Sequence, residues 1–365
     1  MASNIFRQME KEGGLFRNET ALLPEFLPEQ LPGREGQIQE MASYLAVAAK
    51  GIAPQSIVMS GPPGTGKTTS SKLLLKQLCE VSSKPMPIYI NCWECNTRLG
   101  VLMQIISSAG SMLPRRGIAA DEVAATLKEI GKKSGSVFII VLDEVDRLVA
   151  AKEAGVLYDL ARAGETYGMK ASVVAITNDE QFMVKIDGRI RSSLAGKVVE
   201  FKAYAPGELK GILNERAKMA FFPNSLDAEV VPLCAAVGAK NGGDARIALQ
   251  LLWAAGKRAE REGKKKVGVE DVKMEKDNAV EIAGTPAERK KGMLDEFDQK
   301  LAALVQAAGK NGIDGFSIYS KMKADESMAR TIRNRLAKLE GAMLIRSEEN
   351  LEGSGHGKKY FVVGK

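Results

Sequence analysis

Gly61-Pro62-Pro63-Gly64-Thr65-Gly66-Lys67-Thr68 fits the pattern G-x-x-x-x-G-K-[ST], in which a glycine-rich backbone wraps a phosphate group. The residues before it, Ser56–Ser60, enclose an apolar run that predicts a buried strand. Thr69–Leu78, after it, carries leucines at helical spacing. The motif therefore lies between a strand and the N-terminus of a helix, which is the context that it requires. A chance glycine-rich turn, the alternative, would not be expected to have these neighbours.

Each part of this loop has a physical task. Its glycines let the backbone curl until N–H groups point at an anion, and the helix dipole adds positive potential there. We expect Lys67 to reach the β- and γ-phosphates of a nucleotide, and the Thr68 hydroxyl to ligate Mg²⁺. The loop residues that we expect to bind the nucleotide are Gly61, Pro62, Pro63, Gly64, Thr65, Gly66, Lys67, Thr68 and Thr69.

A second apolar run, Val137–Leu142, ends in two carboxylates, Asp143 and Glu144. Asp143 is the expected partner of Mg²⁺, either directly or through another ligand, and Glu144 can orient and deprotonate an attacking water. A strand that merely ends in polar residues is the alternative, which two adjacent acids disfavour. A third run, Ala171–Ile176, precedes Asn178, whose amide can hydrogen-bond the γ-phosphate or the water. An Asn-Asp pair is, however, also typical of a turn.

Strand and helix patterns alternate up to residue 203, and the pattern is helical after it. The strand runs are Ser56–Ser60, Ile88–Ile90, Val137–Leu142, Ser172–Ile176 and Lys197–Phe201. This alternation predicts an α/β domain with a parallel sheet that holds the nucleotide at the carboxyl ends of its strands. The helical stretches that follow are Glu208–Phe221, Asp227–Val237, Gly243–Glu262 and Val269–Ile282. They predict a small all-α domain.

The bulk composition limits the partners. The 365 residues carry a net charge of +7 and a sequence pI of about 9.0, which favours a polyanionic partner. No apolar run is long enough to cross a membrane, and the N-terminus lacks the apolar core of a signal peptide.

The cysteines indicate a reducing environment. Cys92 and Cys95 form a C-x-x-C pair, but a zinc site would need a second pair of ligands, and no other redox signature accompanies them. We expect free, structural thiols in the cytosol.

The chain after residue 290 predicts a separate unit. Its elements are expected at Leu294–Ala308, Phe316–Met322, Glu326–Leu339, Leu344–Arg346 and Lys359–Val363. Three helices followed by a glycine-tipped hairpin indicate a winged helix, whose third helix would enter the major groove of DNA. Residues 290–365 hold 14 Lys+Arg and 10 Asp+Glu, a net charge of only +4, so the placement of the charges must carry the binding.

Helical geometry separates two faces of the third helix. At about 100° per residue, one face should be core and gathers Met328, Ile332, Leu336 and Leu339. The side chains that we expect to contact DNA are Arg330, Arg333 and Asn334 on the opposite face, Lys338 on its flank, and Lys358 and Lys359 in the hairpin. An arginine there could pair with guanine, the asparagine with adenine, and the hairpin lysines with phosphate. A helix face that is merely charged and solvated is the alternative.

On these motifs the chain resembles the archaeal origin-recognition and cell-division-control initiator ATPases, a branch of the AAA+ proteins. The lead-in Leu22–Glu35 is similar to that family's segment near the adenine. Ile176–Asp179 is similar to its sensor 1. Gly243–Leu249 is similar to its sensor 2, the most distinctive match. The resemblance covers nearly the whole chain and implies an N-terminal arm (1–20), an AAA+ α/β nucleotide-binding domain (21–203), a helical lid domain (204–285) and a winged-helix DNA-binding domain (290–365).

The resemblance implies further nucleotide contacts from Tyr204, Arg216 and Arg246. The Arg246 guanidinium would reach the γ-phosphate across the crevice between the lid and the α/β domain, unless it is an ordinary surface arginine. Tyr204 would either stack on adenine or pack at the hinge. The family also suggests an arginine that acts on a neighbouring subunit's nucleotide, for which Arg189 is the better match and Arg191 a competitor. The expected catalytic residues are Lys67, Asp143, Glu144, Asn178, Arg246 and Arg189.

A further implied contact lies in Asn91–Val123, which looks like the family's insertion in the ATPase domain. Arg115 and Arg116 would contact the DNA backbone there, and a solvated basic turn is the alternative.

Taken with the residues, the resemblance implies an ATP-dependent protein that binds double-stranded DNA at replication origins and recruits the replicative helicase. ATP, ADP and Mg²⁺ are the implied cofactors, slow hydrolysis is the implied switch, and self-association on DNA is possible. The expected location is the archaeal cytoplasm, at the nucleoid and not in a membrane. The alternatives are an ATP-gated transcription regulator and a clamp-loader-like motor. A clamp loader would have Ser-Arg-Cys where this chain has Ser192-Ser193-Leu194.

Overall fold

The computed structural model describes residues 14–114, 117–194, 196–283, 296–308, 312–322, 326–341, 345–350 and 357–362. The chain divides into two compact units, Met1–Lys273 and Met274–Lys365, which are described separately.

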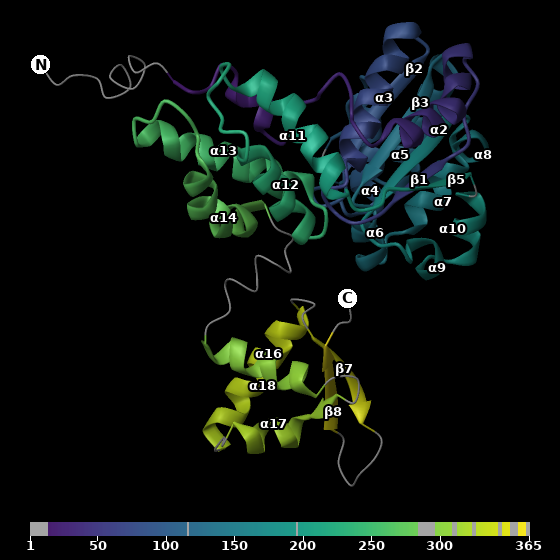
Figure 1. The fold of residues 1–365 in the computed structure, drawn as a ribbon. Coiled ribbons are helices and arrows are strands. Elements are labelled where there is room, and N and C mark those ends of the chain that lie inside the picture. Colours follow the sequence, from purple (N-terminus) through teal and green to yellow (C-terminus); the bar gives the residue numbers. More distant parts are fainter. Residues whose placement is uncertain are drawn as a thin grey trace, which may run out of the picture. The chain divides into compact units, whose positions relative to one another are not determined.

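A five-stranded parallel sheet forms the centre of the α/β domain of the first unit (Figure 1). Its strands are β1 (Ile57–Ser60), β2 (Pro85–Asn91), β3 (Val137–Asp143), β4 (Ala171–Thr177) and β5 (Lys197–Glu200), in the order β2-β3-β4-β1-β5. All seven residues of β3 are buried, as expected for a central strand covered on both faces. Because the strands are parallel, the carboxyl ends of β1, β3 and β4 lie at the same edge of the sheet.

Helices cover both faces of the sheet, because successive side chains of each strand point to opposite sides. On one face, α2 (Glu35–Leu45) and α3 (Lys67–Val81) pack against Ile139 and Val141. On the other face, α4 (Arg98–Ser108), α5 (Ala120–Lys133) and α7 (Gly155–Ala161) pack against Phe138, Ile140 and Leu142. The remaining short helices of this domain are η2 (Ala46–Lys50), α6 (Asp146–Ala150), α8 (Ala163–Tyr167), α9 (Phe182–Lys185) and α10 (Gly188–Ser193).

Four helices follow the sheet. They are α11 (Pro206–Ala220), α12 (Val230–Lys240), α13 (Ala245–Arg261) and α14 (Val269–Ala283). The start of α11 is fixed by Pro206, whose φ suits a first turn, and by Glu208, which accepts the Ala205 N–H at 2.7 Å. The expected α/β domain and helical lid are both confirmed.

Residues 14–27, which we call the strap, pack on the lid helices (Figure 1). The strap includes the short helix η1 (Glu19–Leu22). The Leu15 N–H donates to Glu260 Oε1 at 2.8 Å, and the Phe16 ring stacks on Phe221 with centroids 4.4 Å apart. Glu19 accepts hydrogen bonds from Trp253 and Lys257. The strap therefore joins the lid before the chain enters the sheet.

The second unit has the helices and hairpin of a winged helix. Its elements are α16 (Glu296–Ala307), β6 (Ile313–Asp314), α17 (Gly315–Lys321), α18 (Glu326–Gly341), β7 (Ile345–Asn350) and β8 (Gly357–Val362). The strands form an antiparallel sheet in the order β6-β8-β7. Ile332, Leu336 and Leu339 are fully buried on one face of α18, as the helical spacing predicts. The two-residue strand β6 was not expected.

Candidate nucleotide-binding site

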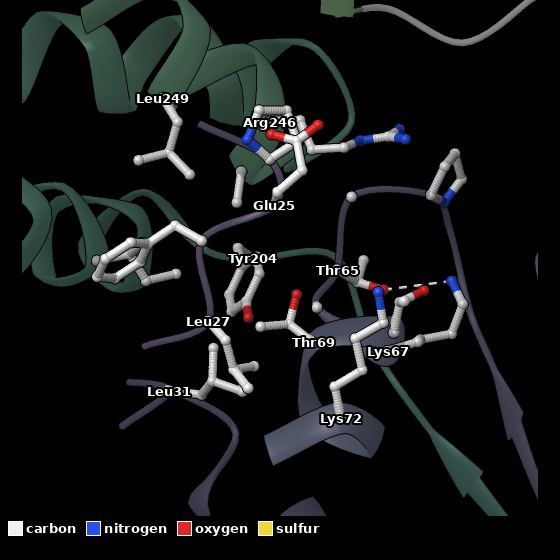
Figure 2. Close-up of a pocket in the computed structure, with 18 of the residues that line it drawn as sticks. Glu25, Leu27, Leu31, Thr65, Lys67, Thr69, Lys72, Tyr204, Arg246 and Leu249 are labelled. Atoms are coloured by element: carbon white, nitrogen blue, oxygen red, sulfur yellow. Dashed lines mark hydrogen bonds between the residues drawn. The ribbon is translucent and has the colours of Figure 1, made fainter. Parts of the chain in front are cut away.

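A cavity of about 230 Å³ lies where three segments meet: residues 61–69, which we call the phosphate-binding loop, the strap, and the lid. The strap and the segment after it contribute Leu23, Pro24, Glu25, Phe26, Leu27 and Leu31 to its wall. The loop contributes the residues from Pro63 to Thr69. The lid contributes Ile212, Arg216, Ala245, Arg246 and Leu249. Figure 2 shows Thr65, Lys67 and Thr69 on the side of the cavity opposite to Arg246 and Leu249. An apolar wall beside a cationic loop suits a base attached to phosphates.

The loop positions Lys67 for an anion. Gly64 and Gly66 adopt left-handed backbone angles, with φ of +72° and +86°, which a glycine tolerates without strain. The Lys67 ammonium is buried and donates to the carbonyl oxygens of Gly61 and Pro62, each at 2.7 Å. Burial lowers the pKa of Lys67 to about 8. A phosphate group at this position would stabilise the charged form.

Two hydroxyl groups donate hydrogen bonds to the Asp143 carboxylate, near Lys67. The Thr68 hydroxyl donates to Asp143 Oδ2 at 2.7 Å, and the Tyr89 hydroxyl donates to the same oxygen at 2.6 Å. Mg²⁺ prefers oxygen ligands and is usually held by one or two protein groups together with substrate phosphates. A hydroxyl and a carboxylate on adjacent elements, next to a phosphate-binding loop, therefore fit this ion.

Glu144 turns away from the strand that carries it. Its backbone φ of 57° is left-handed and breaks the extended conformation, so β3 ends at Asp143. The Glu144 N–H donates to Asp143 Oδ1 at 3.0 Å. The carboxyl group is half-buried, and burial, followed by the neighbouring charge of Asp143, raises its pKa. A carboxylate with a raised pKa at the cavity wall suits a general base.

Asn178 lies exposed at the end of β4 and lines the same cavity. Asp146 holds the backbone there, because it accepts the Thr177 hydroxyl and also the Asn178 N–H, the latter at 3.2 Å. The amide side chain is thereby presented towards the cavity from a fixed turn.

Tyr204 packs at the hinge between sheet and lid. The guanidinium of Arg34 lies 3.7 Å from the centre of its ring, and a Cβ atom on Gly66 would lie 2.7 Å from its hydroxyl. Arg34 is itself buried, and its Nε donates to Thr65 O at 2.8 Å. Arg34 therefore covers one face of the Tyr204 ring, while Tyr204 also lines the cavity, so a contact with adenine stays a prediction.

Arg246 is held at the start of α13 by Asp244. Its Nη2 donates to Asp244 Oδ2 at 2.6 Å and its Nε to Asp244 Oδ1 at 3.1 Å. Asp244 also lies directly against Gly64, where a Cβ atom would approach its Oδ1 to 1.8 Å. The Ala245 N–H donates to Gly64 O at 3.1 Å. Asp244 and Ala245 of the lid therefore contact Gly64 of the phosphate-binding loop, directly before Arg246 in the chain.

Arg216 connects the lid to the strap. Its Nη1 donates to Ala21 O at 2.9 Å, and its guanidinium lies 4.5 Å from the centre of the Phe26 ring. Burial lowers its pKa. Because Arg216 and Phe26 both line the cavity, the strap and the lid shape its wall together.

Arg189 does not line this cavity. It is exposed on α10 and borders a second hollow together with Arg98, Tyr158 and Asp159. An arginine outside its own chain's site is compatible with action on a neighbouring subunit, which stays a prediction.

The structure bears on the expected DNA contacts in part. Arg333 and Asn334 are exposed on α18, opposite its buried face, and Lys359 is half-buried. Arg330, Lys338 and Lys358 are described in their backbone only, and Arg115 and Arg116 lie outside the described residues. The strand register places Glu348 opposite Lys359, so a carboxylate stands near one expected phosphate contact.

Sequence reasoning did not single out Lys72, which lines the cavity, or Arg34, Tyr89 and Asp244, which contact Thr65, Asp143 and Gly64. Arg34 and Asp244 lie inside the two segments that carry the family resemblance, so their charge was a usable signal. Tyr89 sits within an apolar strand run, and nothing in the sequence indicates that its hydroxyl faces Asp143.

All four cysteines are free thiols, as expected. No helix in the described part of the chain is long and apolar enough to cross a membrane.

Comparisons with known proteins agree with this geometry. The model of the AAA domain matches residues 53–178, and the model of the Cdc6 AAA+ ATPase-type lid domain matches residues 210–277. The ORC1-type DNA replication protein 1 of Sulfurisphaera tokodaii is 37% identical over 278 residues, which are 74% of this chain and 70% of that protein. The ORC1-type DNA replication protein of Pyrococcus abyssi is 40% identical over 295 residues, which are 77% of this chain and 70% of that protein.

Solved structures give the same result. The ORC1 protein of Aeropyrum pernix, solved in complex with DNA, has a TM-score of 0.73 and 30% identity, and the match covers 96% of this chain and 94% of that one. Cdc6p of Pyrobaculum aerophilum has a TM-score of 0.66 at 20% identity, with the same coverage, and supports the fold. The chain therefore belongs to the family of ORC1-type DNA replication proteins, with an AAA domain and a Cdc6-type AAA+ ATPase lid.

Proposed function

We propose that this protein is an ATP-dependent DNA-binding protein that recognises replication origins and initiates DNA replication, with slow ATP hydrolysis as its switch. The observation that carries the proposal is the identity of 37–40% with ORC1-type DNA replication proteins over stretches of 278 and 295 residues. The cavity beside the phosphate-binding loop supports the nucleotide part of the proposal. The ORC1 protein of Aeropyrum pernix, solved in complex with DNA, supports the DNA part.

The residues of the cavity divide the work on the nucleotide. Lys67 and the loop N–H groups bind the phosphates, and Thr68 and Asp143 hold Mg²⁺, which neutralises phosphate charge when bound. Glu144 accepts a proton from the attacking water, and Asn178 orients that water or the γ-phosphate. Arg246 contacts the γ-phosphate from the lid. Loss of the γ-phosphate would remove the contact that Arg246 of the lid makes with the nucleotide on the loop. The position of the lid would then change.

The second unit supplies most of the proposed DNA contacts. Arg333 and Asn334 lie exposed on α18, and we place Arg330 and Lys338 with them in the major groove. Lys358 and Lys359 of the hairpin, together with Arg115 and Arg116 of the first unit, contact phosphates. Recruitment of the replicative helicase, self-association through Arg189 and a place at the nucleoid of an archaeal cytoplasm complete the proposal.

Genome-wide footprinting tests this function. Wild type is compared with an Arg330→Ala/Arg333→Ala double variant, and Arg162→Ala, which removes an exposed arginine from the first unit, is the control. We expect one or a few clusters at replication start points that disappear in the double variant and persist in the control. Signal scattered over promoters would indicate a transcription regulator instead. Origin signal that ignores the double substitution would reject the assigned face of α18.

A further inference from the structure

We infer that Tyr89 is a positioning residue of the nucleotide site, whose hydroxyl fixes the Asp143 carboxylate in the orientation that the divalent cation requires. The inference rests on the proposed function, because it concerns the Mg²⁺ that would accompany the nucleotide.

Three donors hold the Asp143 carboxylate. Oδ2 accepts the hydroxyls of Thr68 and Tyr89, at 2.7 and 2.6 Å, and Oδ1 accepts the N–H of Glu144 at 3.0 Å. Asp143 is only 6% exposed, so little water is present to replace a lost partner. If Thr68 ligates Mg²⁺ through a lone pair, its hydroxyl hydrogen could still be donated to Oδ2. Tyr89 would then be the second side-chain donor on that oxygen, and a donor that is not itself a metal ligand.

The sheet places Tyr89 for this contact. Strand β2 is the edge neighbour of β3, and the parallel register pairs Asn91 with Asp143 and Tyr89 with Val141. Ile88 and Ile90 point into the core on one face, so Tyr89 points to the face covered by α3. There the Lys72 ammonium lies 4.6 Å from the centre of its ring. Because Tyr89 remains 39% exposed, its hydroxyl can be removed without opening the core.

A fixed carboxylate matters because Mg²⁺ demands near-ideal octahedral geometry. Groups that orient a metal-binding side chain typically change metal affinity or activity about 10–100-fold when they are removed. Without the Tyr89 hydroxyl, Asp143 keeps its charge but loses a constraint on its rotation. The loss should therefore appear in the dependence on Mg²⁺ and not in the binding of the nucleotide alone.

The test is a Mg²⁺ titration of ADP binding by full-length Tyr89→Phe protein, with a fluorescent ADP analogue. We expect the Mg²⁺ concentration at half-maximal effect to rise about tenfold, while ADP affinity in EDTA matches wild type. In an ATPase assay we expect Tyr89→Phe to have a lower kcat than wild type, and added Mg²⁺ should restore part of that loss. Tyr158→Phe is the matched control, because it removes a surface hydroxyl that accepts from Arg162 at 2.7 Å, and it should titrate as wild type does.

Each outcome decides a different point. If wild type shows no dependence on Mg²⁺, the proposed metal site fails together with the inference. If wild type responds and Tyr89→Phe has the same Mg²⁺ midpoint, the site stands and the role of Tyr89 is wrong. If Tyr89→Phe loses as much ADP affinity in EDTA as it does with Mg²⁺, or has a lower melting temperature than wild type, Tyr89 has a general structural role. Either result would also overturn the inference.

Discussion

Asp143 and Glu144 are neighbours in sequence, yet the backbone gives them different surroundings. Asp143 ends a fully buried strand and is fixed by three donors, whereas the left-handed angle of Glu144 turns its carboxyl group out of the strand. Burial and the charge of Asp143 raise the pKa of Glu144. A metal-holding carboxylate and a proton-accepting one can therefore lie side by side without sharing a task.

Glu144→Gln separates these tasks. The amide keeps the size of the side chain but accepts no proton from water, so we expect ATP hydrolysis to fall at least about 100-fold. The dissociation constants of ATP and ADP should change little. Phosphate release and nucleotide binding measure the two quantities. Glu165→Gln, at an exposed ion pair with Arg162, is the control. Hydrolysis at the wild-type rate in Glu144→Gln would show that another group is the base.

We expect burial of the Cys234 thiol to lower the stability of the protein in alkali. The thiol is fully buried in α12, and burial raises its pKa to about 12 from an ordinary value of 9.0. Between these values the unfolded chain loses the proton and the folded chain keeps it, so stability falls as pH rises above 9. By pH 10 the loss should reach about 1.4 kcal/mol relative to pH 8. Urea unfolding of wild type and Cys234→Ala checks this, because the variant should lack that part of the pH dependence.

Among the elements, the strap depends on one glycine of the lid. A Cβ atom on Gly256 of α13 would lie 2.4 Å from Phe16 Cζ and 3.0 Å from a carbon of Phe221. Alanine normally stabilises a helix interior relative to glycine. Here we expect Gly256→Ala to destabilise the protein by about 1–3 kcal/mol, because the ring of Phe16 must move.

A double-mutant cycle isolates the Phe16 contact. In a Phe16→Ala background the cost of Gly256→Ala should fall by at least about 1 kcal/mol, as is usual for residues in contact. Thermal or denaturant unfolding of the four proteins gives the coupling. Independent effects of the two substitutions would mean that the strap does not rest on α13 at this point.

The sequence predicts those elements whose cause is local. The apolar runs of β1, β3 and β4 and the spacing of Ile332, Leu336 and Leu339 identified strands and a helix face close to their observed bounds. The strap has no such pattern, since its partners, Ala220 and Glu260, lie about 200 residues or more along the chain. The two residues of β6 pair only because β8 passes beside them, so no local pattern marks them as a strand.

The candidate site divides in the same way. Lys67, Thr68, Asp143, Glu144 and Asn178 follow from motifs, and the structure gathers all five around one cavity. Tyr89 follows from no motif, and the segment of the resemblance that contains Arg34 does not show which residues Arg34 contacts. Their roles depend on a strand register and on a hinge that only the folded chain creates.

At the scale of the whole molecule, nucleotide and DNA should be linked. If ATP in place of ADP raises DNA affinity, the same DNA must raise the affinity for ATP over ADP by an equal factor. We expect about fivefold or more, the lower end of usual coupling. Fluorescence anisotropy with Glu144→Gln, which keeps ATP intact, measures both factors. Lys67→Ala, which weakens nucleotide binding, should leave DNA affinity at its nucleotide-free value. DNA affinity that is the same with ATP and ADP would contradict the proposed switch.

The strap also has a consequence for the order of synthesis. Leu15 bonds to Glu260, which is 245 residues later in the chain. At about 5–20 residues per second, the ribosome finishes the strap about 12–50 s before that partner exists. The phosphate-binding loop is made early, but one wall of its cavity is missing until translation has passed the lid. A nascent chain therefore cannot enclose a nucleotide before most of the protein has been made.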